Sequence, residues 1–275
     1  MKKLFILALA VLPMLLACNK KDNGGEMETP VYAEAAAKVT LNGNMVLPVD
    51  GVNSTLQEIC FMRSGRYVAL LEERVKSESP SIVISGTYTF SAGEYKTSGA
   101  LSITVKLENG KTVINDVEID ADVEYSDIVP GSTEDKVSRS WKVSHFILNF
   151  PKLGAKARYE NLAEIVADIE KHEIEISADI KSAILQHEVK EISVDNGIVV
   201  VTFKQAKPFM GQFELGDGTT FTYSFKSDSE INFFSLDAAG SVVFSADKAV
   251  ITVEVKTNNI EELGSGSAEI TLIPA

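Results

Sequence analysis

Few residues of this chain are able to carry chemistry, and they lie far apart. The 275 residues include two cysteines, Cys18 and Cys60, and three histidines, His145, His172 and His187. A cysteine thiolate is a nucleophile and a metal ligand, and histidine is a general base or a zinc ligand near neutral pH. The chain has no Cys-x-x-Cys, no His-Glu-x-x-His, no Gly-x-Ser-x-Gly and no glycine-rich phosphate loop. The sequence therefore predicts neither an enzyme nor a metal or cofactor site.

The histidines have ordinary structural explanations. His172 and His187 each precede a glutamate near a predicted helix end, where a cation stabilises the last carbonyl groups. His145 lies on a predicted strand together with the only tryptophan, Trp141, which we expect to be buried. Strand alternation predicts that His145 shares a face with Trp141 and Val143. It is then either an interior contact for a ligand or a structural histidine that bonds to a neighbour.

Five alternate acids form the most conspicuous charge pattern. On one predicted strand, every second residue is acidic: Asp116, Glu118, Asp120, Asp122 and Glu124. Alternate strand residues are about 6.5 to 7 Å apart, whereas calcium needs six or more oxygens at roughly 2.3 to 2.6 Å. A straight row of carboxylates cannot converge on one ion. We interpret the row as a solvated face, with a docking face for a cationic partner as the alternative.

The elements that position these residues are mainly β. Residues 35–125 alternate apolar and polar side chains between turn signals such as Asp50-Gly51 and Asn109-Gly110, which predicts an N-terminal antiparallel β domain. Residues 126–138 contain Pro130-Gly131 and break the pattern, which predicts a linker. Residues 139–275 then read as one strand, two short helices and a meander of hairpins. Asn161 with Glu164 predicts the start of the first helix, and Ser177 the start of the second.

The N-terminus indicates export. Two lysines precede an apolar run from Leu4 to Leu16, which is too short to span a bilayer, so residues 1–17 are predicted as a signal peptide. The cysteine that follows Leu15-Leu16-Ala17 resembles the lipobox of bacterial lipoproteins. This resemblance implies acylation of Cys18, with palmitate among the chains, and a lipidated flexible tether over residues 18–34. By the sorting rule of enteric bacteria, Asn19 implies the outer membrane, at its periplasmic face or on the cell surface.

Charge and cysteine usage restrict the partners. Removal of 17 of the 275 residues takes two lysines away, so the net charge changes from −13 to −15. Such a surface repels nucleic acid and anionic lipid, which leaves acyl chains on Cys18 as the expected membrane contact. Cys60 is then the only other cysteine, so no intramolecular disulfide is able to form, and we expect it to be a small core residue.

The order of elements in the C-terminal half, with Trp141 near the start of its first strand, resembles the lipocalin-like and fatty-acid-binding barrels of the calycin group. The whole chain resembles two-domain lipoproteins of Gram-negative gut bacteria that carry a lipocalin-like domain. This resemblance implies a non-enzymatic binding protein for a small apolar or amphipathic molecule or a glycan, with Trp141, His145 and Tyr223 as contacts. The alternative is a barrel filled by side chains that binds another envelope protein.

The two halves of the chain also resemble each other. Residues 56–71 align with residues 189–204, and residues 86–93 align with residues 211–218. The chain either contains a duplication or repeats a hairpin pattern by chance.

Overall fold

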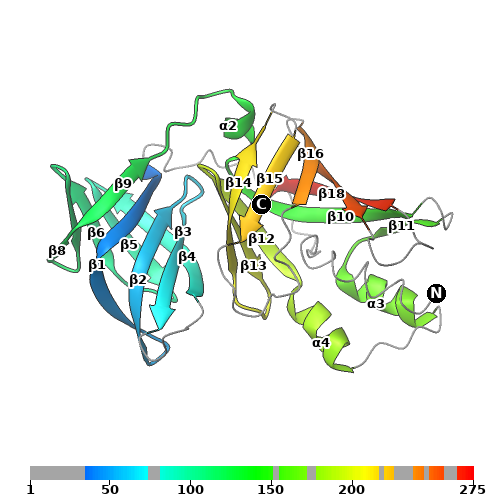
Figure 1. The fold of residues 1–275 in the computed structure, drawn as a ribbon, viewed down its shortest axis with the longest axis horizontal. Coiled ribbons are helices and arrows are strands. Elements are labelled where there is room, and N and C mark those ends of the chain that lie inside the picture. Colours follow the sequence, from blue (N-terminus) through cyan, green and yellow to red (C-terminus); the bar gives the residue numbers. More distant parts are fainter. Residues whose placement is uncertain are drawn as a thin grey trace.

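The computed structural model describes residues 35–73, 81–150, 155–171, 178–216, 220–225, 238–244, 248–256 and 265–275. The predictions for the signal peptide, Cys18, the tether, His172 and Ser177 lie outside these residues. The described chain forms two antiparallel sheets of nine strands each, one from residues 37–125 and one from residues 140–274 (Figure 1). The predicted mainly β fold with two antiparallel sheets is therefore confirmed. None of the helices within this part of the chain is long and apolar enough to span a bilayer.

The N-terminal sheet is a meander in which each strand pairs with the next, from β1 to β8. The last strand, β9, pairs with the free edge of β1, so the sheet curls into a barrel-like shape. Its strands are β1 (Ala37–Val49), β2 (Val52–Phe61), β3 (Arg66–Glu73), β4 (Ser81–Ser91), β5 (Glu94–Gly99), β6 (Thr104–Glu108), β7 (Lys111–Ile114), β8 (Val117–Ile119) and β9 (Ala121–Tyr125).

The hairpin turns of this sheet lie where the sequence predicts them. Asp50 and Gly51 connect β1 to β2, and Asn109 and Gly110 connect β6 to β7. All four have a positive φ, between 50° and 80°. Two consecutive residues at positive φ make the tight turn that matches the twist of the flanking strands.

The acidic row does not form one strand. The chain breaks at Asp120, so that β8 pairs with β7 while β9 pairs with β1. Asp116 has a φ of 64°, which places it in a turn before β8. The prediction of a single continuous strand is therefore wrong, because the chain crosses here from one edge of the sheet to the other. All five acids are exposed, as expected for a solvated face, and three of them pair with lysines: Asp116 with Lys106, Glu118 with Lys111, and Glu124 with Lys38.

The C-terminal sheet closes on itself. Strand β10 pairs with β12 and β11 along one edge and with β18 along the other, which links the two ends of the meander. The elements are β10 (Ser140–Phe150), β11 (Ala155–Tyr159), α3 (Leu162–Lys171), α4 (Ala178–Gln186), β12 (Val189–Asp195), β13 (Ile198–Phe203), β14 (Phe209–Leu215), β15 (Thr220–Phe225), β16 (Ala238–Phe244), β17 (Ala249–Lys256) and β18 (Ser265–Pro274). The strand β11 was not predicted; it follows β10 and comes before the two expected helices.

Helix α3 begins as predicted. Asn161 Oδ1 accepts the backbone N–H of Glu164 at 3.0 Å, and Glu164 Oε2 accepts the backbone N–H of Glu160 at 2.8 Å. The first bond satisfies a donor that the first helical turn leaves free, and the second connects the residue before the cap to that turn. Leu162 and Val166 then turn one face of α3 into the core of the C-terminal sheet.

The predicted linker contains a helix, α2 (Thr133–Val137), which the sequence reading missed. Ser132 caps it, because its Oγ accepts the backbone N–H of Asp135 at 3.0 Å. Val137 at its other end is buried in the core of the C-terminal sheet. The segment between the two sheets is thus an ordered bridge along the top of the molecule in Figure 1.

Candidate functional site

A β-bulge changes the face that His145 occupies. In the pairing of β10 with β18, the register shifts between Val143 and His145, so Ser144 is an extra residue on β10. Trp141 and Val143 point into the core before the bulge, and Phe146 takes the inward position after it. A shift of one residue moves every later side chain to the other face. The prediction that His145 shares the face of Trp141 is therefore wrong.

His145 lies on the outer side of the sheet with hydroxyl partners. Its Nε2 is 3.3 Å from Thr271 Oγ1 on β18, and its Nδ1 is 3.2 Å from Ser144 Oγ. Burial lowers the pKa of His145, and the charges of Arg158 and Lys248 act in the same direction. A neutral imidazole between two hydroxyls is the arrangement of a structural histidine, which was the second of the two interpretations.

Trp141 and Tyr223 are the other two residues predicted to contact a ligand. Trp141 is buried as expected, at 2% exposure, and its indole N–H donates to the carbonyl oxygen of Val137 at 2.8 Å. This bond uses the only donor of the indole ring. Tyr223 lies on β15 between Phe213 of β14 and Ala238 of β16, and its side chain is outside the described part of the structure.

The structure brings a different set of residues together, where the two sheets meet. We call this contact the joint. Its apolar part consists of seven side chains, each at most 5% exposed, from the outer faces of the sheets: Cys60, Met62, Val68 and Val83 on one side, and Ile198, Val200 and Met210 on the other. Cys60 is therefore buried as predicted, but it lies between the sheets rather than inside one of them.

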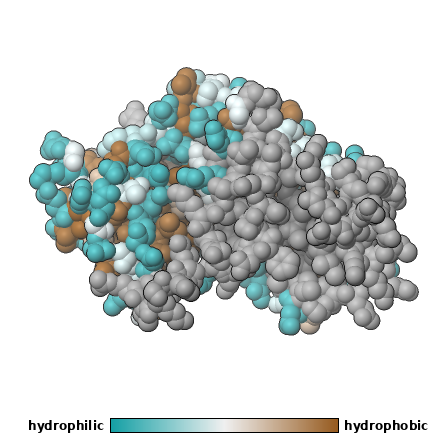
Figure 2. Space-filling view, viewed as in Figure 1, coloured by the Kyte–Doolittle hydropathy of each residue, from teal (hydrophilic) through white to brown (hydrophobic). Residues whose placement is uncertain are grey.

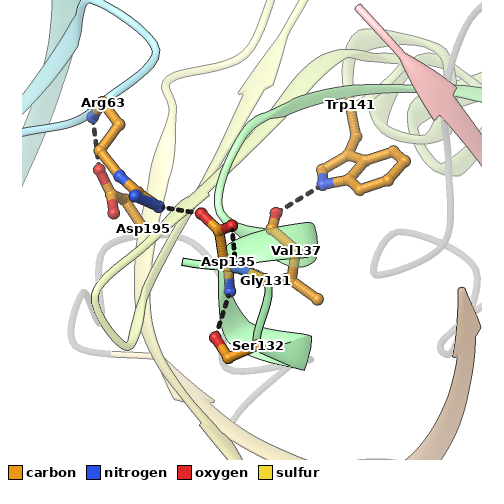
Figure 3. A network of polar contacts seen from close by, with 7 residues as sticks. All are labelled: Arg63, Gly131, Ser132, Asp135, Val137, Trp141 and Asp195. Atoms are coloured by element: carbon orange, nitrogen blue, oxygen red, sulfur yellow. Dashed lines mark hydrogen bonds and ion pairs between the residues drawn. The ribbon is translucent and has the colours of Figure 1, made fainter. Parts of the chain in front are cut away.

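A chain of polar contacts runs along the joint (Figure 3). The backbone N–H of Arg63, in the turn after β2, donates to Oδ2 of Asp195, the last residue of β12. The Arg63 guanidinium instead turns to helix α2, where its Nη1 donates to Asp135 Oδ1 at 2.8 Å. Asp135 Oδ2 in turn accepts the backbone N–H of Gly131 at 2.7 Å. One arginine thus connects the N-terminal sheet to both the bridge and the C-terminal sheet.

A second ion pair crosses the joint at the start of β3. Arg66 Nε on β3 is 2.7 Å from Glu191 Oε1 on β12. The same carboxylate oxygen accepts the hydroxyls of Ser140 at 3.0 Å and Ser193 at 2.9 Å. Because both charged side chains are largely buried, this pair is less screened by salt than a surface pair.

Asp195 is the unusual group of the joint. It is 3% exposed, and burial raises its pKa to about 6, against the opposing effects of the Arg63 backbone N–H and the Arg63 charge. Within the described residues, Asp195 Oδ1 and Arg63 Nε have no hydrogen-bond partner. Asp195, Lys38 and Ile198 line a crevice in the joint that has room for about one water molecule.

Sequence reasoning read Arg63 and Asp195 only as turn residues, since each stands beside a glycine turn. Nothing local indicates that two turns 132 positions apart are in contact.

Among the residues that the structure covers, no group of three or more histidine, cysteine or acidic side chains is arranged to hold a metal ion. Compared with protein-family models, curated proteins and solved structures, the chain has no match. Its function is therefore argued from its own geometry.

Proposed function

We propose that this chain is a non-enzymatic, lipid-anchored protein of the bacterial outer membrane that binds another envelope protein through its outer surface. The observation that carries this proposal is the packing inside both sheets. In the N-terminal sheet, Phe61 and Tyr95 stack with ring centroids 4.1 Å apart, and Tyr67 is fully buried. In the C-terminal sheet, Trp141 and Phe146 belong to one continuous cluster of buried side chains. Among the described residues, the side chains inside both sheets pack against one another, which favours the outer surface as the place of recognition.

The bridge between the sheets offers apolar contact area for such a partner. Tyr125 is 57% exposed and Val129 is 67% exposed, and both precede helix α2. Over the N-terminal sheet, by contrast, apolar side chains are scattered among polar ones on the face shown in Figure 2. Exposed aromatic and aliphatic side chains, here at the end of β9 and in the segment before α2, are enriched at protein interaction sites.

The test is a photo-crosslinking residue placed at position 129 in living cells. We expect a discrete adduct with one envelope protein at Val129, and none at Val52, an exposed valine at the start of β2 that serves as the control. Equal adducts at both positions, or none at Val129, would contradict the proposed surface.

A lipocalin-like barrel that holds a small apolar molecule or a glycan is the second candidate. Two observations favour it: the closed ring of strands made by the β10–β18 pairing, and the insertion of α3 and α4 between β10 and the meander. Native mass spectrometry of the purified protein separates the candidates. A bound small molecule in equal molar amount, without an adduct at Val129, would favour this second function.

The lipid anchor has its own test. Replacing Cys18 by alanine removes the thiol that the lipobox presents for acylation, so we expect labelling with radioactive palmitate to disappear and a soluble protein or an uncleaved precursor to remain. Cys60→Ala is the matched control, because Cys60 is buried and is not part of the lipobox. Undiminished labelling of Cys18→Ala would show that the anchor lies elsewhere.

A further inference from the structure

We propose that the joint is a proton-responsive coupling between the two sheets, which is held closed when Asp195 carries a proton and opens more readily when Asp195 is ionised. This inference is independent of the lipid anchor and of the partner. It assigns to the joint a regulatory role, namely to set how firmly the two sheets hold together.

The first argument is the poor compensation of the Asp195 charge. A buried carboxylate is tolerated when a cation and several donors satisfy it. Here only backbone N–H groups, those of Arg63 and Asn196, act as donors toward the carboxylate, and its Oδ1 has no hydrogen-bond partner within the described residues. The Arg63 guanidinium, which could have neutralised it, binds Asp135 instead. An ionised Asp195 is thus a buried and incompletely paired charge, whereas a protonated Asp195 is not.

The second argument is the modest size of the apolar contact. Among the described residues, four buried side chains from one sheet and three from the other form it, with Leu70 packed against them, and the core of each sheet contains more. Contacts between parts of one chain permit relative motion unless they are large and hydrophobic. One buried charge is therefore able to shift the equilibrium between the closed and the open joint.

The surroundings of Asp195 set the pH range. Arg63 and Lys38 face it from the N-terminal sheet, Glu134 and Asp135 from α2, and the Arg66–Glu191 pair lies on the adjacent strands. Burial is the largest effect and raises the pKa to about 6, and the Glu134 charge adds to it. An exposed aspartate titrates near 3.9. Between about pH 4 and pH 6, the closed joint therefore keeps the proton on Asp195, whereas the open joint has lost it. Closure weakens as the pH rises through this range, and the weakening is complete above about pH 6.

Cys60 is a built-in reporter of this opening. Its thiol is 3% exposed in the closed joint, and in a mature chain carrying Cys18→Ser it is the only thiol. The experiment measures its reaction rate with a small aromatic disulfide from about pH 4.5 to about pH 8. Dividing by the rate in the urea-unfolded protein at the same pH removes the effect of thiol ionisation. A pKa of about 6 in the closed joint and about 4 in the open joint predicts a rise of about 25-fold in relative reactivity across this range.

Three variants make the test specific. Asp195→Asn keeps the shape and removes the charge, so its relative reactivity should stay low and independent of pH. Glu134→Gln removes a neighbouring negative charge, so the midpoint should move to lower pH. Asp116→Asn, on a side chain that is 93% exposed at the far edge of the N-terminal sheet, should keep the parent profile.

The outcomes decide the proposal. A flat profile in the parent protein, or an unchanged rise in Asp195→Asn, would overturn it. Low concentrations of urea give a further criterion, because global unfolding exposes far more surface than opening of the joint. Reactivity that increases with urea as steeply as the unfolding equilibrium would assign the exposure of Cys60 to unfolding and would also overturn the proposal.

Discussion

Replacing Trp141 by alanine is expected to lower the free energy of unfolding by about 3 to 5 kcal/mol. The indole is 2% exposed and packs in the core of the C-terminal sheet. Its N–H bond to the Val137 carbonyl joins that core to helix α2, and the Arg139 guanidinium carbon lies 5.5 Å from the ring centroid. The alanine variant loses the buried surface, the bond to α2 and the cation–π contact together.

Urea unfolding followed by circular dichroism measures the effect, since the variant has no tryptophan to report by fluorescence. Trp141→Phe retains most of the ring and loses the bond to Val137, so we expect a smaller loss of about 1 to 2 kcal/mol. Val129→Ala, at a site that is 67% exposed, should change the stability by less than about 0.5 kcal/mol and serves as the surface control. A Trp141→Ala loss no larger than that of Val129→Ala would contradict the role of the indole.

The turns and the helix start were predictable because their causes are local. Asn109-Gly110 forms a tight turn since both residues adopt a positive φ at little cost, and two adjacent residues carry that information. Asn161 and Glu164 likewise satisfy the first turn of α3 within four positions of each other. Such features are readable from a short window of sequence.

The faces of the strands were less predictable, because a single bulge reverses them. The extra residue Ser144 sends His145 outward, although the alternation from Trp141 places it inward. The break at Asp120 depends on the free edge of β1, with which β9 pairs, and β1 lies about 80 positions earlier in the sequence. Neither event has a local signal in residue type, since the alternation of side chains continues through both positions.

The joint was the least predictable part of the structure, although the two segments that resemble each other in sequence supply most of it. Residues 56–71 and 189–204, which align with each other, form the hairpins β2–β3 and β12–β13. These two hairpins supply most of the joint from their outer faces. In each sheet the first strand also pairs with both the next long strand and the last one. Equivalent topology and equivalent contact surfaces support the duplication hypothesis over chance similarity.

Gly86→Ala is expected to cost about 1 to 3 kcal/mol or more, although this glycine does not have a positive φ. Gly86 lies on β4 opposite Tyr67 of β3 and Gly99 of β5. A Cβ at this position would be 2.7 Å from Tyr67 Cε1 and 2.9 Å from its hydroxyl oxygen, and it would overlap the carbonyl oxygen of Ser98. Tyr67 is fully buried and its hydroxyl bonds to both backbone groups of Leu101, so the ring has no room to withdraw.

The matched control is Gly43→Ala, on β1 in the same sheet. A Cβ there meets only Ile119 Cγ2, at 3.7 Å, so the change should stay within about 0.5 kcal/mol. A double-mutant cycle then identifies the clash. Tyr67→Leu removes both Cε1 and the hydroxyl, so Gly86→Ala should cost less in that background, by about 0.5 kcal/mol or more. Equal costs in the two backgrounds would assign the strain to the Ser98 carbonyl alone, and a loss no larger than that of Gly43→Ala would show that the strands separate to admit the methyl group.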